Sequence, residues 1–238
     1  MFTSKGPTLR ELTVQALSSV ERGYDLLAPK FDHTPFRTPD RFLDATAAAL
    51  RARGPFGAGL DLCCGTGAGL GVLRELGAER VTGVDLSAGM LAEARAAHPA
   101  AELVRADALA LPFRGAFDLA VSFGAFGHFL PEQRPRLFAG VYRALRPGGL
   151  FAFPVGAPPG PATPAYWAAL GFDGAMRVRN ALWRPPFVMY YRTWPLGPVR
   201  ADLEAVGFEV SLTPLEAFGR RADNTPRCRL LLARRPAA

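Results

Sequence analysis

Cysteine, lysine and asparagine are scarce in this chain of 238 residues. Three cysteines, of which Cys63 and Cys64 are adjacent, exclude a disulfide framework and indicate a reducing compartment. No run of about 18 apolar residues occurs, which excludes a membrane-spanning helix. The N-terminal stretch lacks the apolar core of a signal peptide, so we expect a cytoplasmic protein with no membrane partner. Hydrophobic residues at 49% and charged residues at 21% exclude a disordered or fibrous chain.

The formal charge of +7 comes almost entirely from arginine, because Lys5 and Lys30 are the only lysines. A basic protein can bind nucleic acid or an acidic ligand. The arginines are scattered, however, apart from a C-terminal group (Arg220, Arg221, Arg227, Arg229, Arg234 and Arg235). Asparagine is also rare, with only Asn180 and Asn224. We therefore favour a genome-wide bias, or selection against heat-labile residues, over a nucleic-acid surface.

The residue composition changes along the chain and divides it into three parts within one domain. Residues 1–155 contain a mostly helical lead-in up to about residue 53 and then a core of alternating strands and helices. In the lead-in, Thr38 and Pro39 predict a helix start, as N-cap and first helical residue. Residues 156–195 form an insertion rich in proline and aromatic side chains. Residues 196–238 complete the core.

The core alternates short apolar runs with helical patterns. The runs are GLDLC (59–63), RVTGVDL (80–86), AELVRAD (101–107), FDLAVSF (117–123) and GLFAFPV (149–155), with helices expected at 68–76, 88–97 and 131–145. Strands that are apolar throughout are typical of a sheet buried on both faces, and the alternation predicts a parallel, doubly wound sheet. The last two runs, 208–218 and 228–235, are too close for a helical crossover and predict an antiparallel pair.

The segment Leu60 to Gly69 predicts a ligand site. A strand ends in Asp61, a turn of small residues follows, and a helix begins. Glycine there lets the backbone approach a ligand closely, and a helix N-terminus offers free N–H groups. Asp85 and Asp107 end the next two expected strands, so three carboxylates face one crevice. Together they indicate an adenosine carrying a positively charged substituent.

The combination resembles the class I S-adenosylmethionine-dependent methyltransferases, in particular their small-molecule "type 11" branch. The matching stretches are LDLCCGTG, GVDLSAGML, RADALALPF, FDLAVSFGAFGHF and LRPGGLF, over about residues 57–153, and a looser likeness extends back to YDLLAPKFD (24–32). The resemblance implies a Rossmann-like fold with a seven-stranded, mostly parallel sheet whose last strand is antiparallel. It also implies S-adenosylmethionine as cofactor, S-adenosylhomocysteine as product, and direct in-line transfer to a small-molecule acceptor.

Carried over by position, the resemblance assigns the cofactor contacts. Asp61 would orient the methionine amino group, Asp85 would hold the ribose hydroxyls, and Asp107 would read the adenine edge. The remaining implied contacts are the turn residues Cys63, Gly65, Thr66 and Gly67, the adenine neighbours Leu86, Met90 and Ala108, Ser122 and Phe123 near the methionine part, and Phe31 and Arg37 from the lead-in. Arg37 would pair with the methionine carboxylate.

Cys63 departs from the family pattern, which most often has glycine at that position. We therefore expect a backbone conformation there that a residue with a side chain tolerates. Neither Cys63 nor Cys64 has a neighbour at metal-ligand spacing, so no metal site is expected.

A methyl group on a sulfonium is already electrophilic, so the protein need only align a nucleophile and exclude water. If a base is used, His128 is the best-placed candidate, although a structural role is the alternative. The aromatic insertion is expected to cover the substrate through Tyr166, Trp167, Tyr190 and Tyr191, with packing or a dimer contact as the alternative. The acceptor and the oligomeric state are not readable from the sequence.

Three other functions remain open. An RNA or protein methyltransferase is one, although the amino-methylating signature is absent after residue 121. An NAD-dependent oxidoreductase is another, since Gly65, Gly67 and Gly69 followed by Asp85 imitate a dinucleotide fingerprint. Two residues argue against an oxidoreductase. The Asp61 carboxylate would lie close to the negatively charged pyrophosphate, and Asp107 would have no obvious role in binding the dinucleotide. The third is a cofactor-binding protein without turnover.

Overall fold

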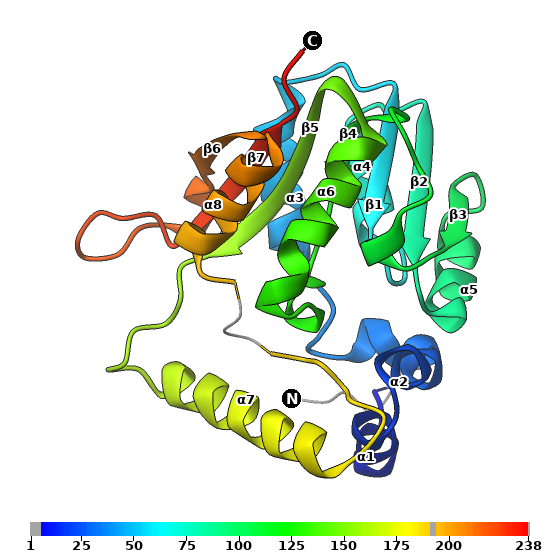
Figure 1. The fold of residues 1–238 in the computed structure, drawn as a ribbon, viewed down its shortest axis with the longest axis vertical. Coiled ribbons are helices and arrows are strands. Elements are labelled where there is room, and N and C mark those ends of the chain that lie inside the picture. Colours follow the sequence, from blue (N-terminus) through cyan, green and yellow to red (C-terminus); the bar gives the residue numbers. More distant parts are fainter. Residues whose placement is uncertain (1–5, 191–193, 238) are drawn as a thin grey trace.

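The computed structural model describes residues 6–190 and 194–237. Its centre is a seven-stranded sheet with the strand order β3-β2-β1-β4-β5-β7-β6 (Figure 1). The strands are β1 (Ala58–Leu62), β2 (Arg80–Asp85), β3 (Glu102–Arg105), β4 (Phe117–Val121), β5 (Leu145–Gly156), β6 (Glu209–Pro214) and β7 (Cys228–Arg234). β7 pairs antiparallel with both β5 and β6, and the other described pairings are parallel. The predicted doubly wound, mostly parallel sheet is confirmed.

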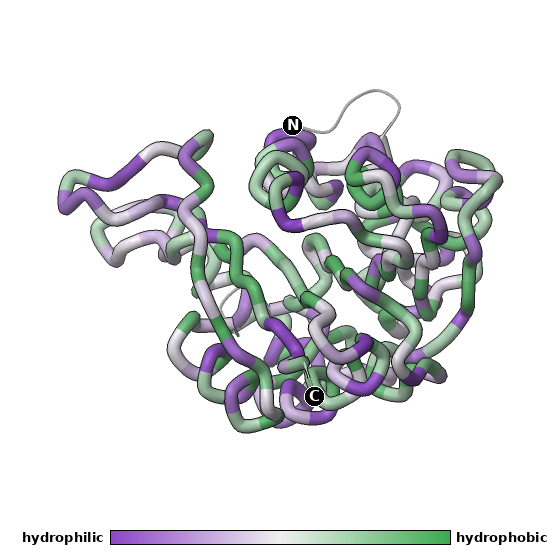
Figure 2. Tube along the Cα trace, turned by 90° about the horizontal axis from the view of Figure 1, so that it is seen from above, coloured by the Kyte–Doolittle hydropathy of each residue, from purple (hydrophilic) through white to green (hydrophobic). Residues whose placement is uncertain are grey.

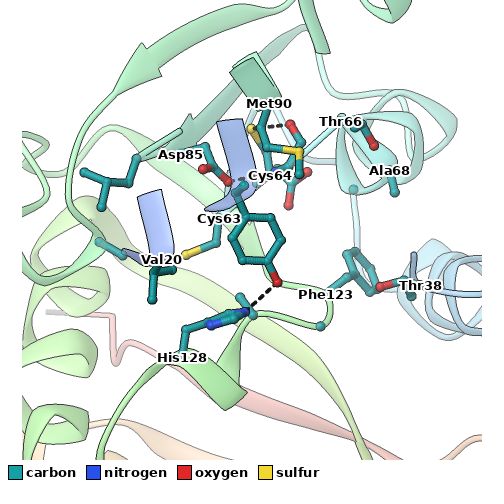
Figure 3. Close-up of a pocket in the computed structure, with 18 of the residues that line it drawn as sticks. Val20, Thr38, Cys63, Cys64, Thr66, Ala68, Asp85, Met90, Phe123 and His128 are labelled. Atoms are coloured by element: carbon teal, nitrogen blue, oxygen red, sulfur yellow. Dashed lines mark hydrogen bonds between the residues drawn. The ribbon is translucent and has the colours of Figure 1, made fainter. Parts of the chain in front are cut away.

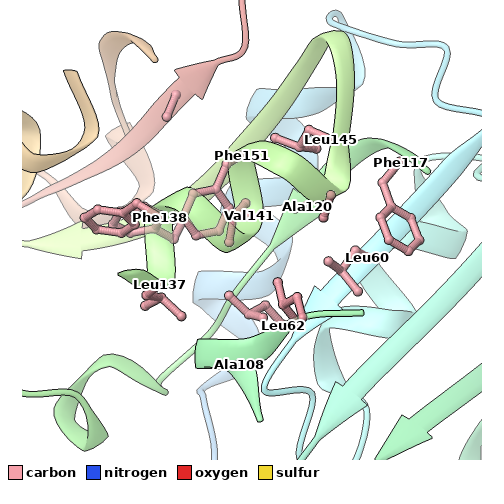
Figure 4. Close-up of a cluster of buried hydrophobic side chains, with 14 of the residues drawn as sticks. Leu60, Leu62, Ala108, Phe117, Ala120, Leu137, Phe138, Val141, Leu145 and Phe151 are labelled. Carbon is pink, nitrogen blue, oxygen red and sulfur yellow. The ribbon is translucent and has the colours of Figure 1, made fainter. Parts of the chain in front are cut away.

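Helices cover both faces of the sheet. On one face lie α3 (Asp40–Arg51), α4 (Ala68–Glu75) and α5 (Ala88–Ala97), and on the other lie α6 (Arg134–Ala144) and α8 (Leu196–Val206). Figure 4 shows Leu137, Phe138 and Val141 of α6 packed toward Leu60 and Phe151 of the strands. Each such side chain is fully buried, and its burial contributes about 1.5–3 kcal/mol.

Two predicted boundaries are wrong in detail. Pro39, not Thr38, occupies the N-cap position of α3, and no side chain caps that helix end. β3 ends at Arg105, so Asp107 lies two residues beyond the strand. There Asp107 starts the short 3-10 turn η2 (Ala108–Ala110), and its Oδ1 accepts the Leu109 N–H at 2.8 Å. The local hydrogen bond of the aspartate ends the strand earlier than the apolar pattern indicates.

The lead-in folds into α1 (Leu9–Leu17), α2 (Val20–Leu27) and the 3-10 helix η1 (Ala28–His33). Of these, α2 and η1 lie beside α5, and α1 packs against α2 (Figure 1). Asp25 of α2 anchors them, because its Oδ1 accepts the Ser87 hydroxyl at 2.6 Å and the Gly89 N–H at 2.8 Å. Asp25 thereby adds a cap to the first turn of α5.

The segment between β5 and α8 contains α7 (Pro164–Leu182), a helix of 19 residues that lies apart from the sheet (Figure 1). Much of its surface is apolar and exposed, with Trp167 at 61% and Leu182 at 81% relative exposure. The chain after α7 returns to the body of the protein. There Phe187 and Tyr190 pack with Met176 of α7 and against α2.

The connection between β6 and β7 extends away from the sheet at the left of Figure 1. It also lies at the left of Figure 2, where purple marks hydrophilic residues. Its arginines bond mainly to nearby groups of the protein. Arg220 pairs with Glu216 at 2.5 Å, and Arg227 Nε donates to the Arg220 carbonyl at 3.0 Å. Near the C-terminus, Arg235 donates to the Leu145 carbonyl at 2.7 Å. Across the described ranges, no helix combines the length and apolar character needed to cross a membrane.

Candidate functional site

A cavity of about 280 Å³ lies where β1, β2 and β4 end. The lead-in, the turns after these strands and the residue Val188 enclose it. Thirteen of the sequence-predicted residues line it, namely Phe31, Arg37, Asp61, Cys63, Gly65, Thr66, Asp85, Leu86, Met90, Asp107, Ala108, Phe123 and His128. Figure 3 shows Asp85, Cys64 and Met90 on one side of this cavity and His128 and Phe123 on the other.

Asp61 is the most deeply buried acid of the cavity, with 1% exposure. The N–H groups of Gly69 and Leu70, at the start of α4, donate to its carboxylate. Its Oδ2 is buried and has no hydrogen-bond partner among the described residues. Burial raises the pKa of Asp61 well above its usual range, and the nearby Asp85 raises it further. A buried acceptor without a donor is costly unless a ligand supplies one.

Asp85 is the last residue of β2, and its carboxylate bonds to both the turn after β1 and the turn after β2. Its Oδ2 accepts the Gly65 N–H at 2.9 Å, and its Oδ1 accepts the Ser87 N–H at 2.9 Å. Burial raises the pKa of this carboxyl, and the two backbone donors oppose that effect. Asp85 therefore shapes the glycine turn as well as lining the cavity.

The glycine turn leaves room where side chains would intrude. A Cβ on Gly69 would lie 2.4 Å from Asp61 Oδ1, so only glycine lets the helix start this close to the carboxylate. Gly65 has a φ of 53° and no atom within 4 Å of a Cβ position, which leaves its surface open. Gly67 does not line the cavity, since it adopts a φ of 100° as the residue before α4 and faces His98.

Cys63 adopts a φ of 56°, in the left-handed region that favours glycine. A residue with a side chain is uncommon in this region, so Cys63 adopts a conformation that the glycine of the family pattern would adopt at lower cost. Directly after Cys63, the Cys64 N–H donates to the Val84 carbonyl at 2.9 Å, which continues the pairing of β1 with β2. Burial raises the pKa of both thiols, which keeps them protonated and unreactive. Within the described ranges, no group of His, Cys, Asp and Glu is placed to hold a metal.

Apolar side chains form the remaining walls. Met90, held in α5 by the Ser87 cap, is 1% exposed, and Leu86 is 41% exposed at the rim. Phe31 and Phe123 line the cavity from the lead-in and from the turn after β4. Arg37 also lines it, but its guanidinium is paired with Asp40 at 2.7 Å.

Several predicted residues do not reach the cavity. Ser122 is buried behind it and donates to the Leu62 carbonyl at 2.9 Å. Trp167 lies exposed on α7 with its N–H donating to Pro161, and Tyr166 beside it lines a different hollow, so the orientation of α7 keeps both away. Tyr190 is buried, and its hydroxyl accepts from Asn180 at 2.9 Å. Tyr191 lies outside the described residues.

The structure adds lead-in residues that the sequence reasoning missed. Tyr24, Val20 and Phe36 line the cavity. The Tyr24 hydroxyl lies 2.8 Å from His128 Nε2, and Thr66 Oγ1 donates to Asp32 at 2.8 Å. The family-like stretch YDLLAPKFD contains Tyr24 and Asp32 and could have indicated that both residues matter. It could not indicate that they contact His128 and Thr66, which are distant in sequence.

Comparisons with known proteins identify the family. A family model described as a methyltransferase domain matches residues 60–149. An S-adenosylmethionine-dependent methyltransferase from Mesorhizobium loti, whose crystal structure is known, is 30% identical. The match covers 81% of this chain and all of that one, with a TM-score of 0.57.

The chain belongs to the class I S-adenosylmethionine-dependent methyltransferases. The predicted family and its cofactor, S-adenosylmethionine, are thereby confirmed. A crystallised complex described as DhpI-SAM-HEP has the same fold at 22% identity and a TM-score of 0.61, and it covers 96% of this chain and all of that one.

Curated methyltransferases match more locally. A malonyl-[acyl-carrier protein] O-methyltransferase of Enterobacter lignolyticus is 43% identical over 114 residues, which are 48% of this chain and 44% of that protein. A tRNA (carboxymethyluridine) O-methyltransferase of Saccharomyces cerevisiae is 31% identical over 132 residues, 55% of this chain and 45% of that protein. The chain thus spans less than half the length of these two relatives.

Proposed function

We propose that this protein transfers a methyl group from S-adenosylmethionine to a small-molecule acceptor. The observation that carries the proposal is the Oδ2 atom of Asp61, which is buried at the cavity without a partner among the described residues. An ammonium group donates strongly to a carboxylate, and the methionine end of the cofactor carries one. Burial and the neighbouring Asp85 raise the pKa of Asp61, and a cation bound beside it would offset both effects.

The other walls fit the rest of the cofactor. Asp85 and Asp107 provide acceptors beyond Asp61, which suit hydroxyl and amine donors. Leu86 and Met90 offer an apolar surface for a flat base. In this assignment Asp61 would hold the ammonium, Asp85 the ribose and Asp107 the adenine edge.

When bound, the cofactor supplies an electrophilic methyl group on its sulfonium. The chain's own residues then have to bind the acceptor, align it and exclude water. Phe31, Phe36, Phe123 and Phe129 line the cavity and provide a dry surface for this purpose. No charged catalytic group is required for the transfer itself.

Three observations favour a small acceptor. The cavity is enclosed by the lead-in and by Val188 of the inserted segment, so we propose residues 156–195 as a partial substrate cover. Five of the six C-terminal arginines donate to groups of the protein itself, namely to the Glu216 carboxylate or to backbone carbonyls. Curated relatives include an enzyme named as a phthiotriol/phenolphthiotriol dimycocerosates methyltransferase, from Mycobacterium leprae, which is 42% identical over 98 residues, 40% of this chain and 36% of that protein. The tRNA-acting relative keeps RNA methylation as the second candidate.

Calorimetric titration with S-adenosylhomocysteine and with NAD tests the cofactor assignment. We expect binding of S-adenosylhomocysteine and no binding of NAD, and the reverse result would overturn the proposal. Incubation with labelled S-adenosylmethionine and either a metabolite extract or total RNA then identifies the acceptor class. Label in a low-mass product supports the proposal, whereas label in RNA alone refutes its acceptor class.

A further inference from the structure

Two polar side chains meet at the side of the cavity opposite Asp85 and Met90. Tyr24 comes from α2 and His128 from the 3-10 turn η3 (Phe126–His128) after β4. The Tyr24 hydroxyl oxygen and His128 Nε2 are 2.8 Å apart, as the dashed line at His128 in Figure 3 marks. His128 Nδ1 lies 2.7 Å from the carbonyl oxygen of Val188, which the inserted segment supplies.

These contacts determine where the hydrogen atoms are. A carbonyl oxygen only accepts, so His128 Nδ1 must carry a hydrogen. A neutral imidazole has one N–H, which leaves Nε2 as an acceptor, and Tyr24 therefore donates its hydroxyl hydrogen to it. Burial lowers the pKa of His128 and so favours this neutral form. With its hydrogen given to His128, the Tyr24 oxygen can interact with a ligand only as an acceptor.

The surroundings of this pair are apolar. Val20, Phe31, Phe36 and Phe129 are among the cavity residues that come from the lead-in and from the turn after β4. Among the described residues that line the cavity, the single cationic group is Arg37, which is already paired with Asp40 at 2.7 Å. A ligand with an apolar body and one hydrogen-bond donor fits such a surface.

We propose that Tyr24 binds and deprotonates the hydroxyl group of the acceptor, with His128 as its proton acceptor, and that the acceptor is a small molecule with an aromatic or apolar body. This inference rests on the proposed methyl transfer. The acceptor proton passes to the Tyr24 oxygen while the Tyr24 proton passes to His128 Nε2, and the acceptor oxygen keeps the electron pair of its O–H bond. The imidazolium formed donates to Tyr24 and Val188, and it returns one proton to water after the product leaves.

The first test uses phenol and toluene, two probes that share an aromatic ring and differ in one hydroxyl. Their affinities are measured for the protein saturated with S-adenosylhomocysteine. We expect phenol to bind about 2- to 12-fold more tightly than toluene, the range for one neutral hydrogen bond. Tyr24→Phe should remove the difference. The control Tyr142→Phe should keep it, because Tyr142 lies on α6 against Phe208, away from the cavity.

The outcomes separate the two proposals. Failure of S-adenosylhomocysteine to bind refutes the proposed function. Binding of S-adenosylhomocysteine with equal affinities for phenol and toluene, or with no measurable phenol binding, overturns the role of Tyr24 alone.

A second test reads the hydrogen positions directly, by nitrogen NMR of protein labelled in its three histidines. The signals of His128 are those that disappear in His128→Asn. We expect a protonated Nδ1 and an unprotonated Nε2, with the Nε2 shift moved by Tyr24→Phe and not by the control Tyr142→Phe. A hydrogen on Nε2 in the wild-type protein would overturn the proposed direction of the bond.

Discussion

Replacing Asp61 by asparagine should make the ligand-free protein more stable and a weaker binder of S-adenosylhomocysteine. Asparagine has nearly the same shape, and its side-chain oxygen can keep the bonds from the Gly69 and Leu70 N–H groups. Its NH₂ group would then occupy the place of Oδ2, which has no partner among the described residues. The substitution therefore removes a buried carboxyl whose ionisation is disfavoured in the ligand-free protein, and it also removes the acceptor for the ligand's ammonium group.

The expected loss of affinity follows from the strength of hydrogen bonds to charged groups. Such bonds contribute about 1.5–3 kcal/mol, so the dissociation constant for S-adenosylhomocysteine should rise about 10- to 150-fold. Calorimetric titration at neutral pH measures this change. An unchanged affinity would refute the assignment of the ammonium group to Asp61.

The stability gain should depend on pH. Because the pKa of Asp61 is raised in the folded state, the native protein retains a proton that the unfolded chain has lost. The free energy of unfolding of the wild type then falls as pH rises from about 4 toward the native pKa, and this loss is absent in Asp61→Asn. The advantage of the variant should therefore grow with pH in denaturant titrations.

Asp118 provides the matched control for this prediction. It lies on the neighbouring strand β4, bonds to Arg146 and the Ala58 N–H at 2.8 Å each, and has a lowered pKa because of these partners. Asp118→Asn should decrease stability above pH 4 and leave ligand affinity unchanged. A destabilised Asp61→Asn that behaved like this control would contradict the reasoning.

Two further pairs of variants test the walls of the site. Gly69→Ala should weaken S-adenosylhomocysteine binding by at least about tenfold. The new Cβ would lie 2.4 Å from Asp61 Oδ1, which is too close, so the Asp61 carboxylate would have to move. Gly71→Ala, on the same helix with only one contact at 3.9 Å, should keep affinity and gain about 0.5–1 kcal/mol in chemical denaturation. Asp25→Ala should cost about 0.5–2 kcal/mol of stability by removing the added cap on α5, and should expose the lead-in to limited proteolysis. The exposed Asp44→Ala should do neither, and equal effects of the two aspartate variants would argue against the anchoring role.

The sheet and its ligand-binding edge could be predicted because both follow from local patterns. Buried parallel strands are apolar throughout, so Asp61 and Asp85 stand out where such runs end. The C-terminal hairpin followed from the short spacing between its strands. The predicted end of β3 at Asp107 was two residues too late, since a local hydrogen bond of Asp107 ends the strand earlier than the apolar pattern indicates.

The acceptor side of the cavity could not be predicted because it depends on contacts between distant segments. The bond between Tyr24 and His128 joins residues 104 positions apart, and neither residue stands in a pattern that indicates the other. Aromatic content in the inserted segment suggested tyrosine and tryptophan as substrate contacts. Instead, the inserted segment lines the cavity with Val188, whereas Tyr166 and Trp167 lie on α7 and do not reach it. Composition predicts that a segment packs or covers, but not which of its residues point inward.

The lead-in is held by carboxylates that bond to the ligand-binding turns themselves. Glu21 pairs with Arg105, Asp25 bonds to the start of α5, and Asp32 accepts from Thr66. A ligand that fixes these turns also fixes the attachment points of α2 and η1, and a docked lead-in favours the ligand by the same factor. Ligand affinity and the docking of the N-terminal helices are therefore linked, so a change that weakens these three contacts should weaken ligand binding as well.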